Sequence, residues 1–147
     1  MHLEVILQEP VQPARPTPLL FVHGMWHAAW CWAENFLPFF AQHGYAVVLQ
    51  DVRGRYESEG KWEPFRDEAE DGYQTIEWAA AQPFSNGKVG TQGGSYLGHN
   101  QWAAARKKPP HLVAAFPGVA STNIYANWLT MGGAFRLSFN YGWGVVR

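Results

Sequence analysis

The sequence has little of several features that mark particular protein classes. Cys31 is the single cysteine among 147 residues, so no disulfide forms within the chain. No apolar run approaches the roughly 18 residues of a membrane-spanning helix, and the N-terminus lacks the basic start and long apolar stretch of a signal peptide. The net charge is −1, from 11 Lys and Arg against 12 Asp and Glu, which gives no basic surplus for nucleic acid or an anionic membrane. We therefore expect a cytoplasmic protein without a nucleic-acid or membrane partner.

Aromatic residues are abundant instead. The chain holds eight Trp, nine Phe and six Tyr, and 47% of its residues are apolar against 16% charged. This composition is that of one folded domain and not of a disordered chain. So many large rings indicate a generous core, an aromatic pocket, or both.

Short apolar runs alternate with segments of helical period along the chain. The expected strands are residues 3–8, 19–22, 45–49, 88–93 and 112–116, and the expected helices are residues 28–42, 67–81 and 97–107. We expect Pro38 to kink or break the first helix and Gly44 to end it. The order predicts an α/β fold with a mostly parallel sheet, flanking helices and residues 3–8 as an edge strand.

The text Gly93-Gly94-Ser95-Tyr96-Leu97-Gly98 lies between an expected strand and an expected helix. A serine on such a tight turn is held out of the sheet, and the amide of the next residue faces the substrate oxygen. The usual pattern is G-x-S-x-G, whereas here the final glycine falls one place late, at Gly98. A plain strand-to-helix turn is the alternative interpretation. The context favours Ser95 as a nucleophile and the Tyr96 amide as an oxyanion donor.

A second feature of the same chemistry lies upstream. His23-Gly24 follows the apolar run of residues 19–22, and in serine hydrolases of this architecture the loop after that strand supplies another oxyanion-hole amide. The segment between Gly24 and Ser95 is long enough for a helix, a strand, a helix and a strand. The two signals therefore occur in the order that such an enzyme requires.

The chain resembles the α/β-hydrolase superfamily. From about residue 49 it is similar to the cocaine esterase-like and X-Pro dipeptidyl-peptidase-like (peptidase S15 type) hydrolases, whose turn also carries its second glycine late. The segments that carry this similarity are residues 50–54, 58–60, 71–78, 86–90, 93–98 and 120–121. The resemblance implies Ser95 as nucleophile, the Tyr96 amide as oxyanion donor, and ester or amide substrates. It also implies an acyl pocket lined by aromatics, among them Trp128 and Trp143.

The first 48 residues resemble a different branch, the small single-domain α/β-hydrolases of the methylesterase and hydroxynitrile-lyase type. The text that carries this is His23-Gly24-Met25-Trp26. The resemblance implies the Met25 amide as the second oxyanion donor, and we add Trp26 as a candidate substrate-binding residue. The sequence thus combines two parts that resemble different branches of the superfamily, and the two parts meet near residues 48–51.

A serine nucleophile needs a base and an orienting acid, which follow the serine in this superfamily. No Asp or Glu follows Ser95, and the only later histidines are His99 and His111. We expect His99 one helical turn below the nucleophile and His111 at the opposite end of the sheet, so neither is placed as a base. We therefore expect an N-terminal portion of an α/β-hydrolase, with a partial core in residues 1–120 and the start of a cap segment in residues 121–147.

Other functions receive less support from the sequence. His23 and His27 have a zinc-like spacing but no third ligand, so we expect no metal, and no nucleotide motif indicates a cofactor. Arg53 is a candidate to pair with an acid near the site. The expected partner is a small-molecule ester or amide, and the oligomeric state is not predicted. The alternatives are a catalytically silent α/β-hydrolase-like binding module and an unstable truncation without function.

Overall fold

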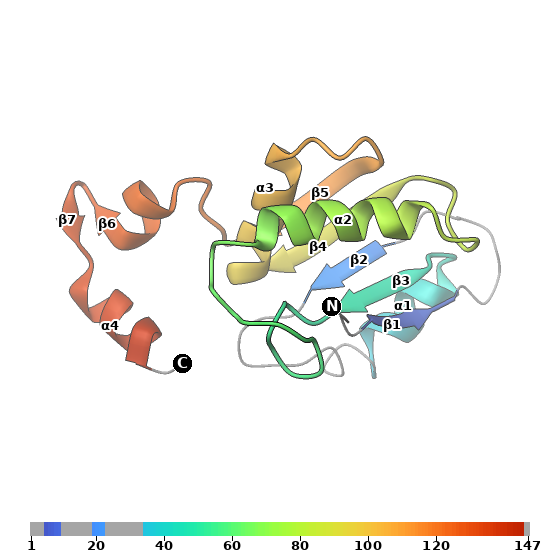
Figure 1. Cartoon of the computed structure of the whole chain (residues 1–147), viewed down its shortest axis with the longest axis horizontal. Coiled ribbons are helices and arrows are strands. Elements are labelled where there is room, and N and C mark those ends of the chain that lie inside the picture. The colour runs from blue at the N-terminus through green and yellow to red at the C-terminus, as the bar shows by residue number, and fades with distance from the viewer. Residues whose placement is uncertain (1–4, 10–18, 23–33, 146–147) are drawn as a thin grey trace.

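The structure is a computed structural model that describes residues 5–9, 19–22 and 34–145. Five strands form one sheet in the order β1-β3-β2-β4-β5 (Figure 1). Their bounds are β1 (Val5–Gln8), β2 (Leu19–Val22), β3 (Val47–Gln50), β4 (Val89–Gly94) and β5 (Leu112–Gly118). β1 is antiparallel to β3, and all other neighbours are parallel. The mostly parallel sheet with an N-terminal edge strand is therefore confirmed.

In the described part of the chain, three helices cover this sheet: α1 (Phe36–Gln42), α2 (Glu68–Ala80) and α3 (Tyr96–Arg106). Val47 and Leu49 of β3 pack with Leu37 of α1, whereas Val48 packs with Ile76 of α2 and Ala104 of α3. Because successive side chains of a strand point to opposite faces, α1 covers one face of the sheet and α2 and α3 cover the other. This explains why residues 46–49 are apolar without alternation.

The predicted helix over residues 28–42 needs correction. Residues 28–33 lie outside the described residues, and α1 begins only at Phe36. Pro38 therefore falls in the first turn, where backbone N–H groups have no acceptor within the helix, and it neither kinks nor breaks it. Gly44 ends the helix as expected. It has φ +83°, its N–H donates to Ala41 O at 3.1 Å, and Tyr45 N–H donates to Phe40 O at 3.0 Å, which is a Schellman motif.

α2 and α3 match the predicted helices within one residue at each end, but the strand expected over residues 112–116 is longer. β5 continues through Pro117 and Gly118. Proline is tolerated in a strand at the edge of a sheet, and β5 is an edge of the sheet that the described residues form. Its side chains are correspondingly exposed, with Phe116 69% accessible.

The chain leaves the sheet after β5 as a separate arm (Figure 1). The arm contains a short π-helix, η2 (Ile124–Leu129), a two-stranded hairpin, β6 (Thr130–Met131) and β7 (Ala134–Phe135), and α4 (Leu137–Val145). Within the described residues, no helix has both the length and the apolar character needed to cross a membrane.

Candidate active site

Ser95 lies on the turn between β4 and α3, with Gly94 ending the strand and Tyr96 beginning the helix. Its backbone has φ +57° and ψ −123°, a conformation that is unfavourable for a residue with a Cβ. The turn is held by a hydrogen bond of 2.9 Å from Ser95 N–H to Gly118 O. Ser95 is exposed to solvent. The structure therefore presents this serine on a strained strand-to-helix turn at the surface.

Two glycines let the chain pass closely around this turn. A Cβ on Gly93 would lie 2.6 Å from the Cβ of Leu97. A Cβ on Gly98 would lie 2.5 Å from the Cβ of Ala120 and 2.8 Å from Gly118 O. All three distances are shorter than a real Cβ atom tolerates, so α3 approaches the end of β5 only because Gly98 has no side chain. This contact is the physical reason for a glycine three residues after the serine.

The buried side chain of Gln101 stabilises the serine turn through hydrogen bonds. This residue was not identified from the sequence. The side chain is 4% exposed, and its Nε2 lies 3.0 Å from Gly93 O and 3.2 Å from Phe116 O. Thr91 Oγ1 donates to its Oε1 at 3.0 Å. One glutamine thus ties α3 to both β4 and β5. The signal was a polar residue four positions after Leu97, on the face of the helix that faces the sheet.

Tyr96 follows the serine and opens α3. Its side chain is 4% exposed, and its phenol donates a hydrogen bond to the carboxylate of Glu68. Burial raises the pKa of Tyr96, and the hydrogen bond to Glu68 raises it further, against smaller opposite effects of Trp62 and the Phe65 backbone. The phenol therefore stays protonated. The backbone N–H of Tyr96 belongs to the first helical turn, where no carbonyl within the helix accepts it.

Tyr96 belongs to an aromatic cluster. The cluster consists of Phe65, Tyr96, His99, Trp128 and Trp143. Phe65 is at its centre, with ring centroids 5.1 Å from Tyr96 and from Trp128 and 5.6 Å from Trp143. The two tryptophans contact each other at 5.4 Å and 81°. The structure thus brings Trp128 and Trp143 together next to the serine turn. Phe65 was missed, since nothing in its local pattern distinguishes it. Met25 and Trp26 lie outside the described residues.

The two later histidines occupy different ends of the sheet. The His99 ring packs edge-on against Phe65 at 5.0 Å. Burial lowers the pKa of His99, against the opposing effects of the Glu68 charge and a hydrogen bond to the Ser121 backbone. His111 lies at the start of β5, where its Nδ1 is 2.7 Å from Glu77 Oε2. Among the described residues, no histidine or carboxylate hydrogen-bonds to Ser95 Oγ.

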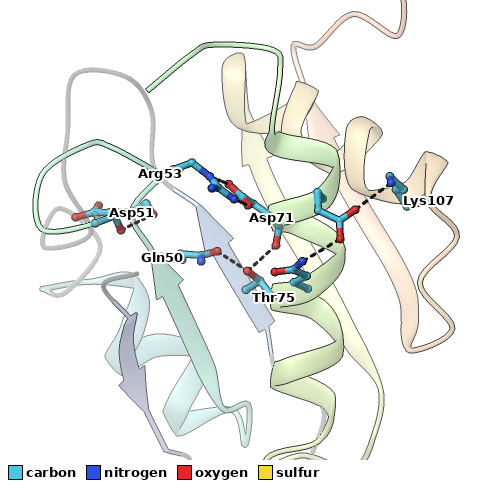
Figure 2. Close-up of polar contacts among 9 residues, drawn as sticks. Gln50, Asp51, Arg53, Asp71, Thr75 and Lys107 are labelled. Atoms are coloured by element: carbon cyan, nitrogen blue, oxygen red, sulfur yellow. Dashed lines mark hydrogen bonds and ion pairs between the residues drawn. The ribbon is translucent and has the colours of Figure 1, made fainter. Parts of the chain in front are cut away.

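Arg53 pairs with an acid, as the sequence suggested. Its Nε donates to Asp71 Oδ2 at 2.8 Å, and its Nη2 donates to Asp71 Oδ1 (Figure 2). The hydrogen bond to Asp71 raises the pKa of Arg53. Thr75 Oγ1 lies 2.8 Å from both Gln50 Oε1 and the Asp71 carbonyl oxygen. These contacts join α2 to the last residue of β3 and to the segment that follows it. No group of three or more His, Cys, Asp or Glu side chains suited to a metal occurs in the described part of the chain, and His23 and His27 lie outside it.

Two hollows lie near the turn. A small, partly open pocket of about 50 Å³ lies where α2 and α3 meet β3 and β4, and Glu68 and Asn100 are among its lining residues. A wider groove of about 760 Å³ runs along α3 from Phe65 and His99 to Arg106. Ser95 lines neither of them.

Comparison with known proteins places this geometry in a family. The model of the X-Pro dipeptidyl-peptidase (S15) family matches residues 1–147, which include the first 48 residues. The cocaine esterase of Rhodococcus sp. (strain MB1 Bresler) is 37% identical over 136 residues, which are 89% of this chain and 24% of that protein.

Solved structures agree with the sequence match. A CocE/NonD family hydrolase from Staphylococcus aureus superposes with a TM-score of 0.79 at 29% identity, over 96% of this chain and 29% of that one. An α-amino acid ester hydrolase gives a TM-score of 0.71 at 28% identity, over 95% of this chain and 26% of that one. The chain thus spans between 24% and 29% of the length of these three relatives. The fold is that of the α/β-hydrolases, and the chain belongs to the S15 family of X-Pro dipeptidyl-peptidases.

Proposed function

We propose that this chain carries the nucleophile and oxyanion-hole part of a serine hydrolase that cleaves ester or amide bonds through an acyl-enzyme. The observation that carries the proposal is the Ser95 turn: an exposed serine with φ +57° between a parallel strand and a helix. Such strain persists only where the surrounding contacts enforce it, and it is concentrated at functional sites. The printed names of two relatives, cocaine esterase and α-amino acid ester hydrolase, support an ester.

The geometry of the turn supports a reaction in two steps, acylation of the serine and hydrolysis of the acyl-enzyme. Ser95 Oγ attacks the carbonyl carbon, its proton passes to a base, and the carbonyl oxygen gains a negative charge. The Tyr96 amide donates to this oxyanion, aided by the positive end of the α3 dipole, and the Met25 amide is proposed as the second donor. The intermediate then expels the alcohol or amine with the proton, leaving the acyl group on Ser95. Water releases the acid by the reverse sequence.

The aromatic cluster supports an apolar or aromatic acyl group. Trp128 and Trp143 contact each other and Phe65, whose ring contacts Tyr96. Large rings side by side offer apolar area and edge-to-face contacts to an aromatic acyl group. We propose Trp128, Trp143 and Trp26 as the substrate-binding residues.

A catalytically silent binding module is the second candidate. It is favoured by the finding that no described histidine or carboxylate hydrogen-bonds to Ser95 Oγ. Without a base, Ser95 retains the weak nucleophilicity of an ordinary alcohol. We therefore expect that activated esters such as p-nitrophenyl acetate acylate Ser95 of this chain only slowly, and that their turnover is poor.

Labelling with a fluorophosphonate, followed by intact-protein and peptide mass spectrometry, tests the proposal. We expect one slow adduct, located on Ser95, absent from Ser95→Ala and unchanged in Ser138→Ala, which removes an exposed serine of the arm. Excess p-nitrophenyl benzoate should slow the labelling. An adduct that persists in Ser95→Ala would show that the nucleophile is wrong. No adduct, together with saturable quenching of tryptophan fluorescence by the ester, would favour the binding module.

A further inference from the structure

Glu68, the first residue of α2, is a buried carboxylate that the proposed chemistry does not use. It is 6% exposed. Its Oε1 accepts hydrogen bonds from the Tyr96 phenol and, at 3.0 Å, from the Phe65 backbone N–H. Its Oε2 is buried and has no partner among the described residues. A buried carboxylate with an unpaired oxygen costs folding free energy, so its presence calls for a physical reason.

The two groups that Glu68 holds come from segments that are far apart in the sequence. Tyr96 supplies the backbone amide proposed to receive the oxyanion. Phe65 lies at the centre of the aromatic cluster and stacks on Trp143. One oxygen atom therefore joins the loop before α2 to the first turn of α3, and through Phe65 it reaches the C-terminal arm.

The hydrogen bond to Glu68 offsets an unfavourable backbone conformation at Phe65. Phe65 has φ +69°, which is unfavourable for a bulky residue. The hydrogen bond from its N–H to Glu68 stabilises this conformation, which in turn sets the direction of the ring. The N-terminal end of the α2 dipole favours negative charge at this position, and so favours the carboxylate as the acceptor.

We propose that Glu68 is a positioning residue of the site: it holds Tyr96, and with it the oxyanion amide, and Phe65, and with it the Trp128–Trp143 pair. The part that concerns the amide rests on the function proposed above. The part that concerns the tryptophans does not.

The proposal is tested on the full 147-residue chain with Glu68→Ala, Glu68→Gln and Tyr96→Phe. Gln keeps an acceptor oxygen of the same reach, whereas Ala removes it. Glu70→Gln is the matched control, because Glu70 lies in the same helical turn but is exposed. Circular dichroism is recorded for the exciton couplet that two tryptophans 5.4 Å apart at 81° produce, with Trp143→Phe defining its amplitude. Amide hydrogen exchange of Phe65 and the rate of fluorophosphonate labelling at Ser95 are measured on the same samples.

We expect Glu68→Ala to lose most of the couplet, to exchange the Phe65 amide at least about tenfold faster, and to label Ser95 about tenfold more slowly, as fits the loss of hydrogen bonds to a charged group. Glu68→Gln should restore all three signals, and Glu70→Gln should resemble the wild type. Tyr96→Phe should slow labelling while leaving the couplet and the Phe65 exchange unchanged.

A folded Glu68→Ala protein with an unchanged couplet and unchanged Phe65 exchange would overturn the proposal. If Glu68→Ala does not fold, unchanged labelling in Tyr96→Phe would overturn the part that concerns the amide. Loss of the couplet in Glu68→Gln would overturn the part that concerns the tryptophans. If labelling is the same in Ser95→Ala and the wild type, the proposed function fails, while the couplet and the exchange still decide whether Glu68 positions the aromatic cluster.

Discussion

Gly98 of α3 packs directly against Ala120: a Cβ on Gly98 would lie 2.5 Å from the Cβ of Ala120. It would also lie 2.8 Å from the carbonyl oxygen of Gly118, which receives the Ser95 N–H. The helix after the serine and the chain after β5 therefore meet at a contact with no room for one methyl group.

The first prediction concerns this contact. Gly98→Ala should lower the free energy of unfolding by about 1–3 kcal/mol, because overpacking outweighs the gain in helix propensity of roughly 1 kcal/mol. Adding Ala120→Gly should recover only part of the loss, since the clash with Gly118 O remains. Gly142→Ala is the control: its Cβ would meet nothing within 4 Å, so no loss is expected. Urea denaturation measures all four proteins, and an unchanged midpoint for Gly98→Ala would contradict the packing.

The second prediction concerns the strain at Ser95. Ser95→Gly should stabilise the protein by about 1–2 kcal/mol, because glycine adopts φ +57° without the penalty of a Cβ. Ser95→Ala keeps the Cβ and should leave the stability close to that of the wild type. Thermal unfolding of the three proteins separates the outcomes. Equal stability of the glycine and alanine variants would show that the turn is not strained.

The third prediction concerns the buried glutamine beneath the turn. Gln101→Leu should destabilise the protein by about 1–3 kcal/mol, because it leaves the carbonyls of Gly93 and Phe116 without their donor. It should also increase hydrogen exchange at the end of β4. Gln74→Leu, which removes an exposed glutamine of α2, is the control and should have little effect. A Gln101→Leu protein as stable as the wild type would argue against the network.

The fourth prediction compares two ion pairs. The Arg53–Asp71 pair has two hydrogen bonds and side chains 28% and 14% exposed, whereas the Lys61 side chain of the Lys61–Glu63 pair is 82% exposed. Arg53→Ala should cost about 1–2 kcal/mol, since a bidentate, half-buried pair is stronger than an exposed one. Lys61→Ala should leave the melting temperature unchanged. Equal effects of the two substitutions would contradict the structural role of Arg53.

The fifth prediction concerns pH. Burial lowers the pKa of His99 in the folded chain below its ordinary value of 6.5. The unfolded chain therefore binds a proton at His99 before the folded chain does, so stability falls as the pH drops below about 6.5. Above that pH the histidine is neutral in both states and contributes no slope. His99→Gln should flatten the stability profile below pH 6.5 only. A slope that is unchanged in this variant would exclude His99 as its source.

The sequence predicted the sheet, its edge strand, α2, α3 and the serine turn, because each depends on local pattern: buried apolar runs, helical period and glycines at turns. It was wrong about Pro38, since the effect of a proline depends on where the helix begins. The extent of β5 was missed because an edge position tolerates Pro117. Gln101, Glu68 and Phe65 were missed as site residues because their importance arises from contacts between segments far apart in the sequence. The arm after Ser121 has no periodic pattern from which to assign it.

The strand order also determines when each strand can pair with its neighbours during synthesis. β2 lies between β3 and β4, and Leu19 pairs with Gly90, which leaves the ribosome 71 residues later. At about 5–20 residues per second, the edge of β2 that pairs with β4 stays unpaired for roughly 4–14 seconds. Before α2 is made, β1, β2 and β3 can form only a three-stranded sheet whose α2 side, including Val48, is open to water, and α3 follows only after β4. Misassembly of the nascent chain is therefore expected to concentrate in this window, before β4 is made.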